Sequence, residues 1–321
     1  MTDESDAKPA AQVELDAQVK PAAKHKKSNA LLNVMIAISA IAMIGALGLI
    51  AYPTFSDWWN RMHQSYAVAG YVEQTKDMSG AERKAMLKAA HEYNERLAAN
   101  GDRWHMTDAQ KREYDETLDV TGTGIMGYVT IPRIKVKLPV YHGTSDGVLQ
   151  IAAGHLAGTS LPVGGATTHA VVSGHTGLPS ARLLTGLDEL KKGDTFAFHV
   201  LDETYTYQVD QISVVLPSEI SKLNIEPGAD YATLITCTPY GVNSHRLLVR
   251  GHRIPNPKVP DKTQYDEPGE MTAVAAAVIG LLVFVAGCAF VGLARLWRRS
   301  WIVRHGLCAG AARAIRLVVR G

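Results

Sequence analysis

The chain has 321 residues, 46% of them hydrophobic and 20% charged, and its 33 basic and 31 acidic side chains leave a formal net charge of +2. This balance argues against a nucleic-acid-binding protein, which normally carries a strong basic excess on one face. It also excludes a highly charged disordered chain, because nearly half of the residues can contribute to a buried core. Three cysteines are too few for a disulfide framework.

Two long uncharged runs predict transmembrane helices. Residues 30–52 and residues 271–294 contain 23 and 24 residues without a charged side chain. At about 1.5 Å of rise per residue, either run can cross a hydrocarbon core of roughly 30 Å. A cleaved signal peptide is the alternative for the first run, because lysines precede it. The run exceeds the usual apolar core of a signal peptide and no small-residue cleavage site follows it, so we expect an uncleaved anchor.

The charges that flank these runs predict the orientation of the chain. The ten residues before Ala30 carry four lysines and no acid, and the tail after Ala294 carries seven arginines and no acid. Because positive charge accumulates on the cytoplasmic side, both termini are expected in the cytoplasm. The sequence therefore predicts a cell-membrane protein with two spans, in which residues 53–270 face the extracellular side.

The outward part changes character along its length. Ser79 and Glu82 form a capping box at the start of an amphipathic helix over residues 79–100. From Gly127 onward, short alternating stretches are punctuated by Gly and Pro, with two brief helices expected near residues 147–153 and 181–190. Short strands that do not alternate with helices predict a closed antiparallel or mixed β-barrel. The expected fold is therefore mainly β, with a helical region before the barrel.

The outward part contains a single thiol, Cys237, because Cys288 lies in the second apolar run and Cys308 in the C-terminal tail. A lone thiol on an oxidising face is either an inert buried group or a nucleophile. Cys237 ends the stretch TLITC, and HRLLVRG follows after a turn. If the two pair about a point between residues 241 and 242, Cys237 faces Arg246 and Ile235 faces Leu248.

This pairing would give the thiol a chemical partner. Directly opposed residues on one face of a sheet have Cβ atoms about 5 Å apart. A guanidinium at that distance favours the thiolate and offers donors to a developing oxyanion. Arg246 is therefore a candidate for oxyanion stabilisation, and a solvated strand charge is the alternative interpretation.

A nucleophilic thiol also needs a proton carrier, and His175 is the candidate. It follows an apolar stretch in VVSGHTG, where the glycines allow a backbone or substrate to approach closely. We expect six other histidines of this region at the surface: His63, His91, His105, His155, His199 and His252.

The motifs SGHTG, TLITC and HRLLVRG, in this order and spacing, resemble the signature of the sortases, cysteine transpeptidases of the Gram-positive cell surface. The resemblance covers about residues 124–254. Within that family, GYVTIPRIKVKLPVYHGT (127–144) and the second membrane segment resemble class C, the pilin-polymerising branch. The resemblance implies a sortase-type barrel in which Cys237 is the nucleophile, His175 the general acid and base, and Arg246 the oxyanion stabiliser. No cofactor or metal is expected.

The resemblance also implies a reaction and its partners. Cys237 would cleave an LPXTG-like sorting signal of a pilin subunit between Thr and Gly through a thioester, and a Lys of another pilin subunit would resolve it. The expected partners are LPXTG-bearing pilin subunits and the membrane. Two alternatives stay open: a sortase that anchors surface proteins to a peptidoglycan precursor, and a non-catalytic, membrane-tethered β-barrel that binds a partner. A papain-like peptidase fits poorly because its Cys precedes its His in the chain.

Class C sortases carry a lid with an Asp-Pro-aromatic motif before the barrel, and the matching residues here are Gly101-Asp102-Arg103-Trp104. The resemblance implies that Asp102 pairs with Arg246 and that Trp104 covers Cys237. Arg103 replaces the family proline, so the fixed φ angle of proline is lost. The expected organisation is a cytoplasmic tail (1–29), an anchor helix (30–52), a helical region with the lid (53–123), a catalytic barrel (124–254), a linker (255–270), a second span (271–294) and a basic cytoplasmic tail (295–321).

Overall fold

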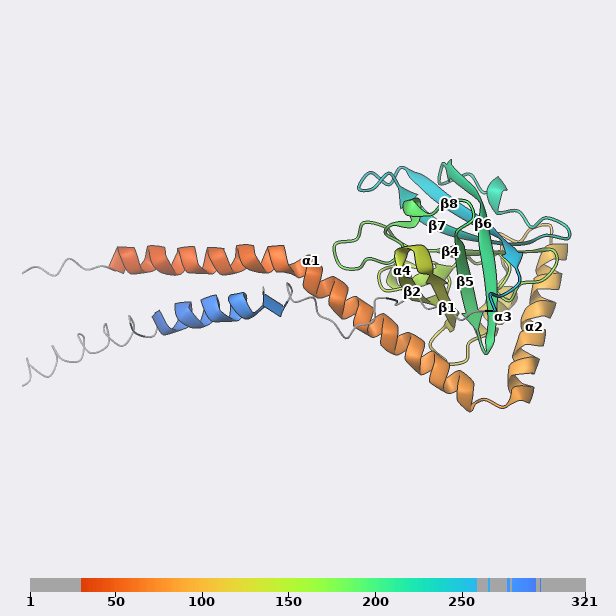
Figure 1. Ribbon diagram of the computed structural model, residues 1–321, viewed down its shortest axis with the longest axis horizontal. Coiled ribbons are helices and arrows are strands. Elements are labelled where there is room, and N and C mark those ends of the chain that lie inside the picture. The colour runs from red at the N-terminus through yellow and green to blue at the C-terminus, as the bar shows by residue number, and fades with distance from the viewer. Residues whose placement is uncertain (1–29, 259–264, 266–275, 278, 293–294, 296–321) are drawn as a thin grey trace, which may run out of the picture. The chain divides into compact units, whose positions relative to one another are not determined.

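The computed structural model describes residues 30–258, 265, 276–277, 279–292 and 295 (Figure 1). The chain divides into two compact units, of which the larger comprises Ile44–Cys288 and contains the barrel. The predicted cytoplasmic tails apart from Arg295, most of the predicted linker and Cys308 lie outside the described residues.

Helix α1 (Ala30–Asp77) is 48 residues long and continues through Pro53, where the sequence analysis ended the apolar helix. Its apolar N-terminal part is exposed and, by length and composition, long enough to cross a membrane. In the second apolar run the structure describes an apolar helix over Ile279–Gly292, and residues 271–275, 278 and 293–294 of the run lie outside the described residues. The second span therefore stays a prediction.

Contacts with the barrel account for the continuation of α1 beyond Pro53. Asn60 donates to the carbonyl of Ser180, and Gln64 donates to the carbonyl of Ile151. The Tyr71 hydroxyl donates to a carbonyl of the first strand. These residues recur at intervals of about one or two helical turns, so they share one face of α1. The contacts of this face with the barrel offset the cost of the backbone hydrogen bond that a proline removes from a helix.

Helices α2 (Gly80–Ala99) and α3 (Asp108–Glu116) complete the helical region. The predicted capping box of Ser79 and Glu82 is confirmed. An equivalent box of Thr107 and Gln110 starts α3. Between the two helices lies the segment Gly101–Trp104, which is held at both ends by capped helices.

Eight strands form the predicted closed barrel, in the order β1-β2-β3-β4-β7-β8-β6-β5. Most neighbours are antiparallel, whereas β2 with β3 and β4 with β7 are parallel. The bounds are β1 Ile125–Ile131, β2 Val136–His142, β3 Ala153–His155, β4 Thr168–Ser173, β5 Thr195–Val200, β6 Glu203–Val215, β7 Asp230–Thr238 and β8 His245–Ile254.

Short helices join the strands. The two predicted near residues 147–153 and 181–190 occur as α4 (Asp146–Leu149) and as the 3-10 helix η2 (Leu187–Glu189). Two further 3-10 turns are η1 (Pro132–Ile134) and η3 (Ser221–Leu223).

Side chains alternate between the two faces of the barrel wall. Leu234 of β7 and Val249 of β8 point into the main core. Their neighbours Ile235 and Leu248 instead join Val171 and Leu223 in a small separate cluster, which we call the outer cluster. Because strand residues two apart share a face, Cys237 lies on the same outer face as Ile235. The barrel therefore presents the thiol outward rather than into its core.

Candidate active site

The hairpin of β7 and β8 pairs Cys237 with Arg246 and Ile235 with Leu248. This is the register that the sequence predicted. Cys237 is half-buried at the end of β7, so its thiol is accessible from the outer face. The pairing sets Arg246 directly opposite Cys237 on the outer face without any long-range contact, because the turn between the strands sets the register.

Arg246 is oriented by carbonyl groups of its own turn. Its Nη1 donates to the carbonyl of Asn243 at 3.2 Å and to that of His245 at 3.1 Å. These two bonds use one nitrogen of a group that carries five N–H donors. The arrangement therefore positions the guanidinium while leaving further donors for an oxyanion.

His175 reaches the same place from β4. The parallel register pairs Ser173 with Ile235, and the Gly174 N–H continues it by donating to the carbonyl of Ile235 at 3.0 Å. The Thr236 hydroxyl donates to the carbonyl of Gly174 at 2.8 Å. Continued one residue further, this register would set His175 beside Cys237. The strand before His175 is thus a direct neighbour of the hairpin that carries Cys237 and Arg246.

Gly174, directly before His175, has no room for a side chain because Leu184 packs against it. A Cβ atom at this position would lie 2.8 Å from the Cγ of Leu184, closer than real Cβ contacts. The sequence correctly singled out the glycines beside His175 as places of close approach. The group that lies close to Gly174 is the side chain of Leu184, in the loop that follows.

The predicted lid residues have separate environments. Trp104 packs against the outer cluster, on the face that carries Cys237. Asp102 is different, because its Oδ1 lies 2.8 Å from Nδ1 of His105 and its side chain is 68% exposed. The expected ion pair between Asp102 and Arg246 is therefore wrong for this conformation. The physical reason is local: the Asp102 N–H is bonded to Asn100, and the carboxylate turns toward a histidine three residues along the chain.

Sequence analysis missed the role of Arg103, which it treated as a lost proline. The side chain is 8% exposed. Its guanidinium donates to the carbonyls of Gly158 and Leu223, each at 3.0 Å, and to Oδ1 of Asn224 at 3.3 Å. Burial lowers the pKa of Arg103. An arginine inside a mostly polar stretch offers no sign of these acceptors, which are mostly backbone atoms of distant loops.

His155 corrects another expectation, because it is fully buried rather than at the surface. Its Nδ1 lies 3.0 Å from the Tyr114 hydroxyl of α3, and its Nε2 lies 2.8 Å from the carbonyl of Ser160. Burial lowers the pKa of His155 to about 4, so the ring is neutral at physiological pH. It links α3 to β3 as a structural group.

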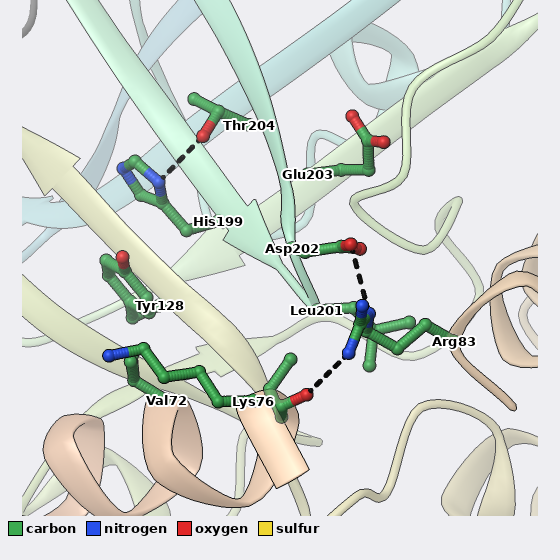
Figure 2. A pocket seen from close by; sticks show the side chains of 10 residues that line it. Val72, Lys76, Arg83, Tyr128, His199, Leu201, Asp202, Glu203 and Thr204 are labelled. Atoms are coloured by element: carbon green, nitrogen blue, oxygen red, sulfur yellow. Dashed lines mark hydrogen bonds and ion pairs between the residues drawn. The ribbon is translucent and has the colours of Figure 1, made fainter. Parts of the chain in front are cut away.

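The cavities of the barrel lie away from these residues. Figure 2 shows one of about 340 Å³, bounded by the end of α1, the start of α2 and the hairpin of β5 and β6. In it Arg83 bonds Asp202, and His199 bonds Thr204. A larger cavity of about 800 Å³ lies on the outer side of β1, β5 and β6. Neither includes Cys237, His175 or Arg246, so the chemistry of these residues, and not cavity volume, places the candidate site on the outer face of the barrel.

A metal centre is not indicated in the part of the chain that the structure describes, where no three His, Cys, Asp or Glu side chains are grouped to hold an ion.

Comparison with known proteins agrees with this fold. Residues 129–254 match the sortase domain family. The crystal structure of sortase C1 from Streptococcus agalactiae is 52% identical, with a TM-score of 0.59 over 60% of this chain and 100% of that chain. Sortase C from Streptococcus pneumoniae is 46% identical, with a TM-score of 0.54 over 60% of this chain and 97% of that one. For sortase C from Clostridium perfringens the identity is 40% and the TM-score 0.53, over 60% and 100% of the two chains.

A curated relative gives a shorter match. Sortase A of Streptococcus agalactiae serotype III is 31% identical over 117 residues, which is 36% of this chain and 47% of that protein. This chain therefore spans about half the length of that relative. With the structural matches, the comparisons show that the chain belongs to the sortase family. The solved structures it resembles are class C sortases.

Proposed function

We propose that this sortase is a class C transpeptidase that cleaves an LPXTG-like signal between Thr and Gly and joins the Thr to a Lys of another pilin subunit. The observation that carries the proposal is the pairing of Cys237 with Arg246 across β7 and β8, with His175 next to them in the continued β4 register. Work on the Streptococcus pneumoniae enzyme concerns pilin substrate specificity, and the Clostridium perfringens enzyme was solved with a C-terminal cell wall sorting motif. Both relatives support this substrate class.

In the first half of the reaction, the thiolate of Cys237 attacks the carbonyl carbon of the Thr–Gly bond. The oxygen gains negative charge, and the guanidinium of Arg246 donates to it. The C–N bond then breaks, and His175 in its protonated form gives a proton to the leaving amine of Gly. The products are a thioester on Cys237 and a released C-terminal fragment.

In the second half, the amine of an acceptor Lys attacks the thioester carbonyl. His175, now neutral, takes the proton that the amine loses, and Arg246 again holds the oxyanion. The C–S bond breaks and returns the thiolate, which leaves an isopeptide bond between the two subunits. A position on the outer face suits this step, because two protein chains must reach Cys237 from outside the barrel.

The test uses the full chain in detergent with an LPXTG-type peptide. Mass spectrometry should detect a thioester adduct, and Cys237→Ala should abolish it. Absence of an adduct on the wild-type chain would instead support the non-catalytic binding module. The acceptor then separates the two sortase roles: transfer to a Lys-bearing pilin domain supports polymerisation, whereas transfer to a peptidoglycan-type amine alone supports wall anchoring.

We also propose that the chain spans the membrane twice, with the barrel outside, and that the domain boundaries expected from the sequence hold. The exposed apolar part of α1 supports the first anchor. This arrangement is tested with single cysteines placed in each terminal tail of the protein. A membrane-impermeant thiol reagent is added to intact cells, and cytoplasmic tails should be protected from it. Labelling of either tail would overturn the two-span topology.

A further inference from the structure

The guanidinium of Arg103 donates the hydrogen bonds that join the segment Gly101–Trp104 to the barrel. Its acceptors come from two separate places: Gly158 lies between β3 and β4, and Leu223 and Asn224 lie between β6 and β7. All three acceptors are uncharged. The planar guanidinium presents its donors in a fixed fork, so it can meet these acceptors together in one geometry. A lysine has one ammonium group and cannot span them in the same way.

The same contact positions Trp104. The Arg103 guanidinium carbon lies 4.5 Å from the centre of the Trp104 ring, within the range of a cation–π interaction. The ring packs against the outer cluster, which contains Ile235 and Leu248. The Trp104 ring thus contacts the Arg103 guanidinium and the outer cluster, and Arg103 holds it against the barrel wall.

Gly158 provides the space for this docking. A Cβ atom at Gly158 would lie 2.6 Å from the carbonyl oxygen of Arg103 and 3.0 Å from Cε3 of Trp104. The φ angle of Gly158 is +88°, a conformation that favours glycine. The barrel therefore has a notch that the backbone of the segment fills, and this is independent of the hydrogen bonds of Arg103.

The docked segment occupies the surface next to the catalytic pair. Ile235 pairs with Leu248 on the same face of the hairpin as the pair of Cys237 and Arg246, two residues away along each strand. Two residues along a strand correspond to roughly 7 Å. A peptide chain that reaches Cys237 along the outer face of β7 and β8 must therefore displace Trp104.

We propose that Arg103 is the positioning residue that keeps this surface closed, and that Asp102 does not share this role. Opening the segment removes the Arg103 contacts to Gly158, Leu223 and Asn224 together, so all the hydrogen bonds of the closed segment to the barrel depend on one side chain. Asp102 contacts His105 within its own segment and is mostly exposed, so its loss leaves the docking intact. Only the peptide measurement described below rests on the proposed function. Closure itself is measured by the rate at which the Cys237 thiol is labelled, without a substrate.

The experiment measures the rate at which a bulky thiol reagent labels Cys237 in the full chain in detergent. Cys288→Ser and Cys308→Ser form the background, so that Cys237 is the remaining thiol. We expect Arg103→Ala to raise the labelling rate about ten-fold and Arg103→Lys to raise it less. Asp102→Ala should stay within two-fold of the background chain. Arg96→Ala is the matched control, because Arg96 is an exposed arginine of α2 that pairs with Glu113.

A second readout uses an LPXTG-type peptide. Because the closed segment competes with the peptide for the same surface, Arg103→Ala should lower KM several-fold and change kcat little. If Arg103→Ala does not fold, as judged by circular dichroism, Asn224→Leu removes one acceptor and should accelerate labelling in the same direction. Labelling that is unchanged in the folded Arg103 variant, or accelerated equally by Asp102→Ala, would overturn the inference. Accelerated labelling with no thioester in any variant would support the closure and reject the proposed reaction.

Discussion

The β7–β8 hairpin and the segment Gly101–Trp104 lie on the same outer face, yet they are specified in different ways. In the hairpin, Cys237 and Arg246 are nine residues apart and a single turn sets their register. In the segment, Arg103 depends on acceptors that are 55 and 120 residues distant. The comparison teaches that reactive groups can be placed by local strand geometry, while access to them depends on the complete fold.

The largest expected effect tests whether the local geometry includes His175. His175→Ala should lower the rate of thioester formation by about 10²- to 10⁴-fold, the usual contribution of a positioned acid and base. The measurement is single-turnover cleavage of an LPXTG-type peptide. His91→Ala, an exposed histidine of α2, is the control and should be unaffected. A loss of less than ten-fold for His175→Ala would mean that the β4 register does not deliver the proton carrier.

Arg246→Ala comes next, with an expected loss of about 10²- to 10³-fold in kcat, the range for removing an oxyanion donor. Arg246→Lys should recover part of it, because an ammonium retains the charge but not the fixed fork. Arg250→Ala is the control on the same strand. Its guanidinium bonds Asp210 and stacks over Tyr231, so it has a structural role. An equal kcat loss in both variants at equal stability would contradict the assignment of Arg246.

The pH dependence of stability tests a group that long-range packing buries, His155. The pKa of buried His155 is about 4, below the roughly 6.5 of an unfolded histidine. Between these values the unfolded state binds more protons, so the contribution to stability is complete above about pH 6.5 and is lost as pH falls toward 4. The loss is about 1.4 kcal/mol per pH unit, or on the order of 3 kcal/mol in total. Urea unfolding between pH 4 and 7 measures it.

His155→Gln should flatten this dependence by about half, because His169 also has a pKa of about 4 through burial. The slope with pH is the readout, so a general loss of stability in the variant does not obscure it. An unchanged slope would show that His155 becomes charged without cost. Because His155 lies just before the loop that carries Gly158, acid should also loosen the docking of Arg103.

Much of the site could be predicted because its chemistry follows the strand pattern. The single outward thiol, the arginine across the turn and the histidine after an apolar strand were all visible as residue types at fixed spacings. The mainly β barrel followed from short alternating stretches in the same way. The length of α1 could not be predicted, because Pro53 signals a helix end and the contacts that offset it, such as Asn60 with Ser180, come from the distant barrel. The predicted partner of Asp102 was wrong for the opposite reason, because its carboxylate bonds a histidine three residues along the chain.

The smallest expected effect asks whether long-range hydrogen bonds matter for stability away from the catalytic face. The buried Tyr71 hydroxyl donates to the carbonyl of Met126 at 3.2 Å and accepts the N–H of Leu201 at 2.7 Å, which ties α1 to the barrel. Tyr71→Phe keeps the ring but leaves the Leu201 N–H without this partner, so we expect a loss of about 1 to 3 kcal/mol in the free energy of unfolding. Tyr66→Phe on the same helix, where the side chain is exposed, should cost almost nothing. Cleavage of the peptide should be the same in both variants; slower cleavage by Tyr71→Phe would show that the outer face depends on α1, and would join the two regions that the comparison separates.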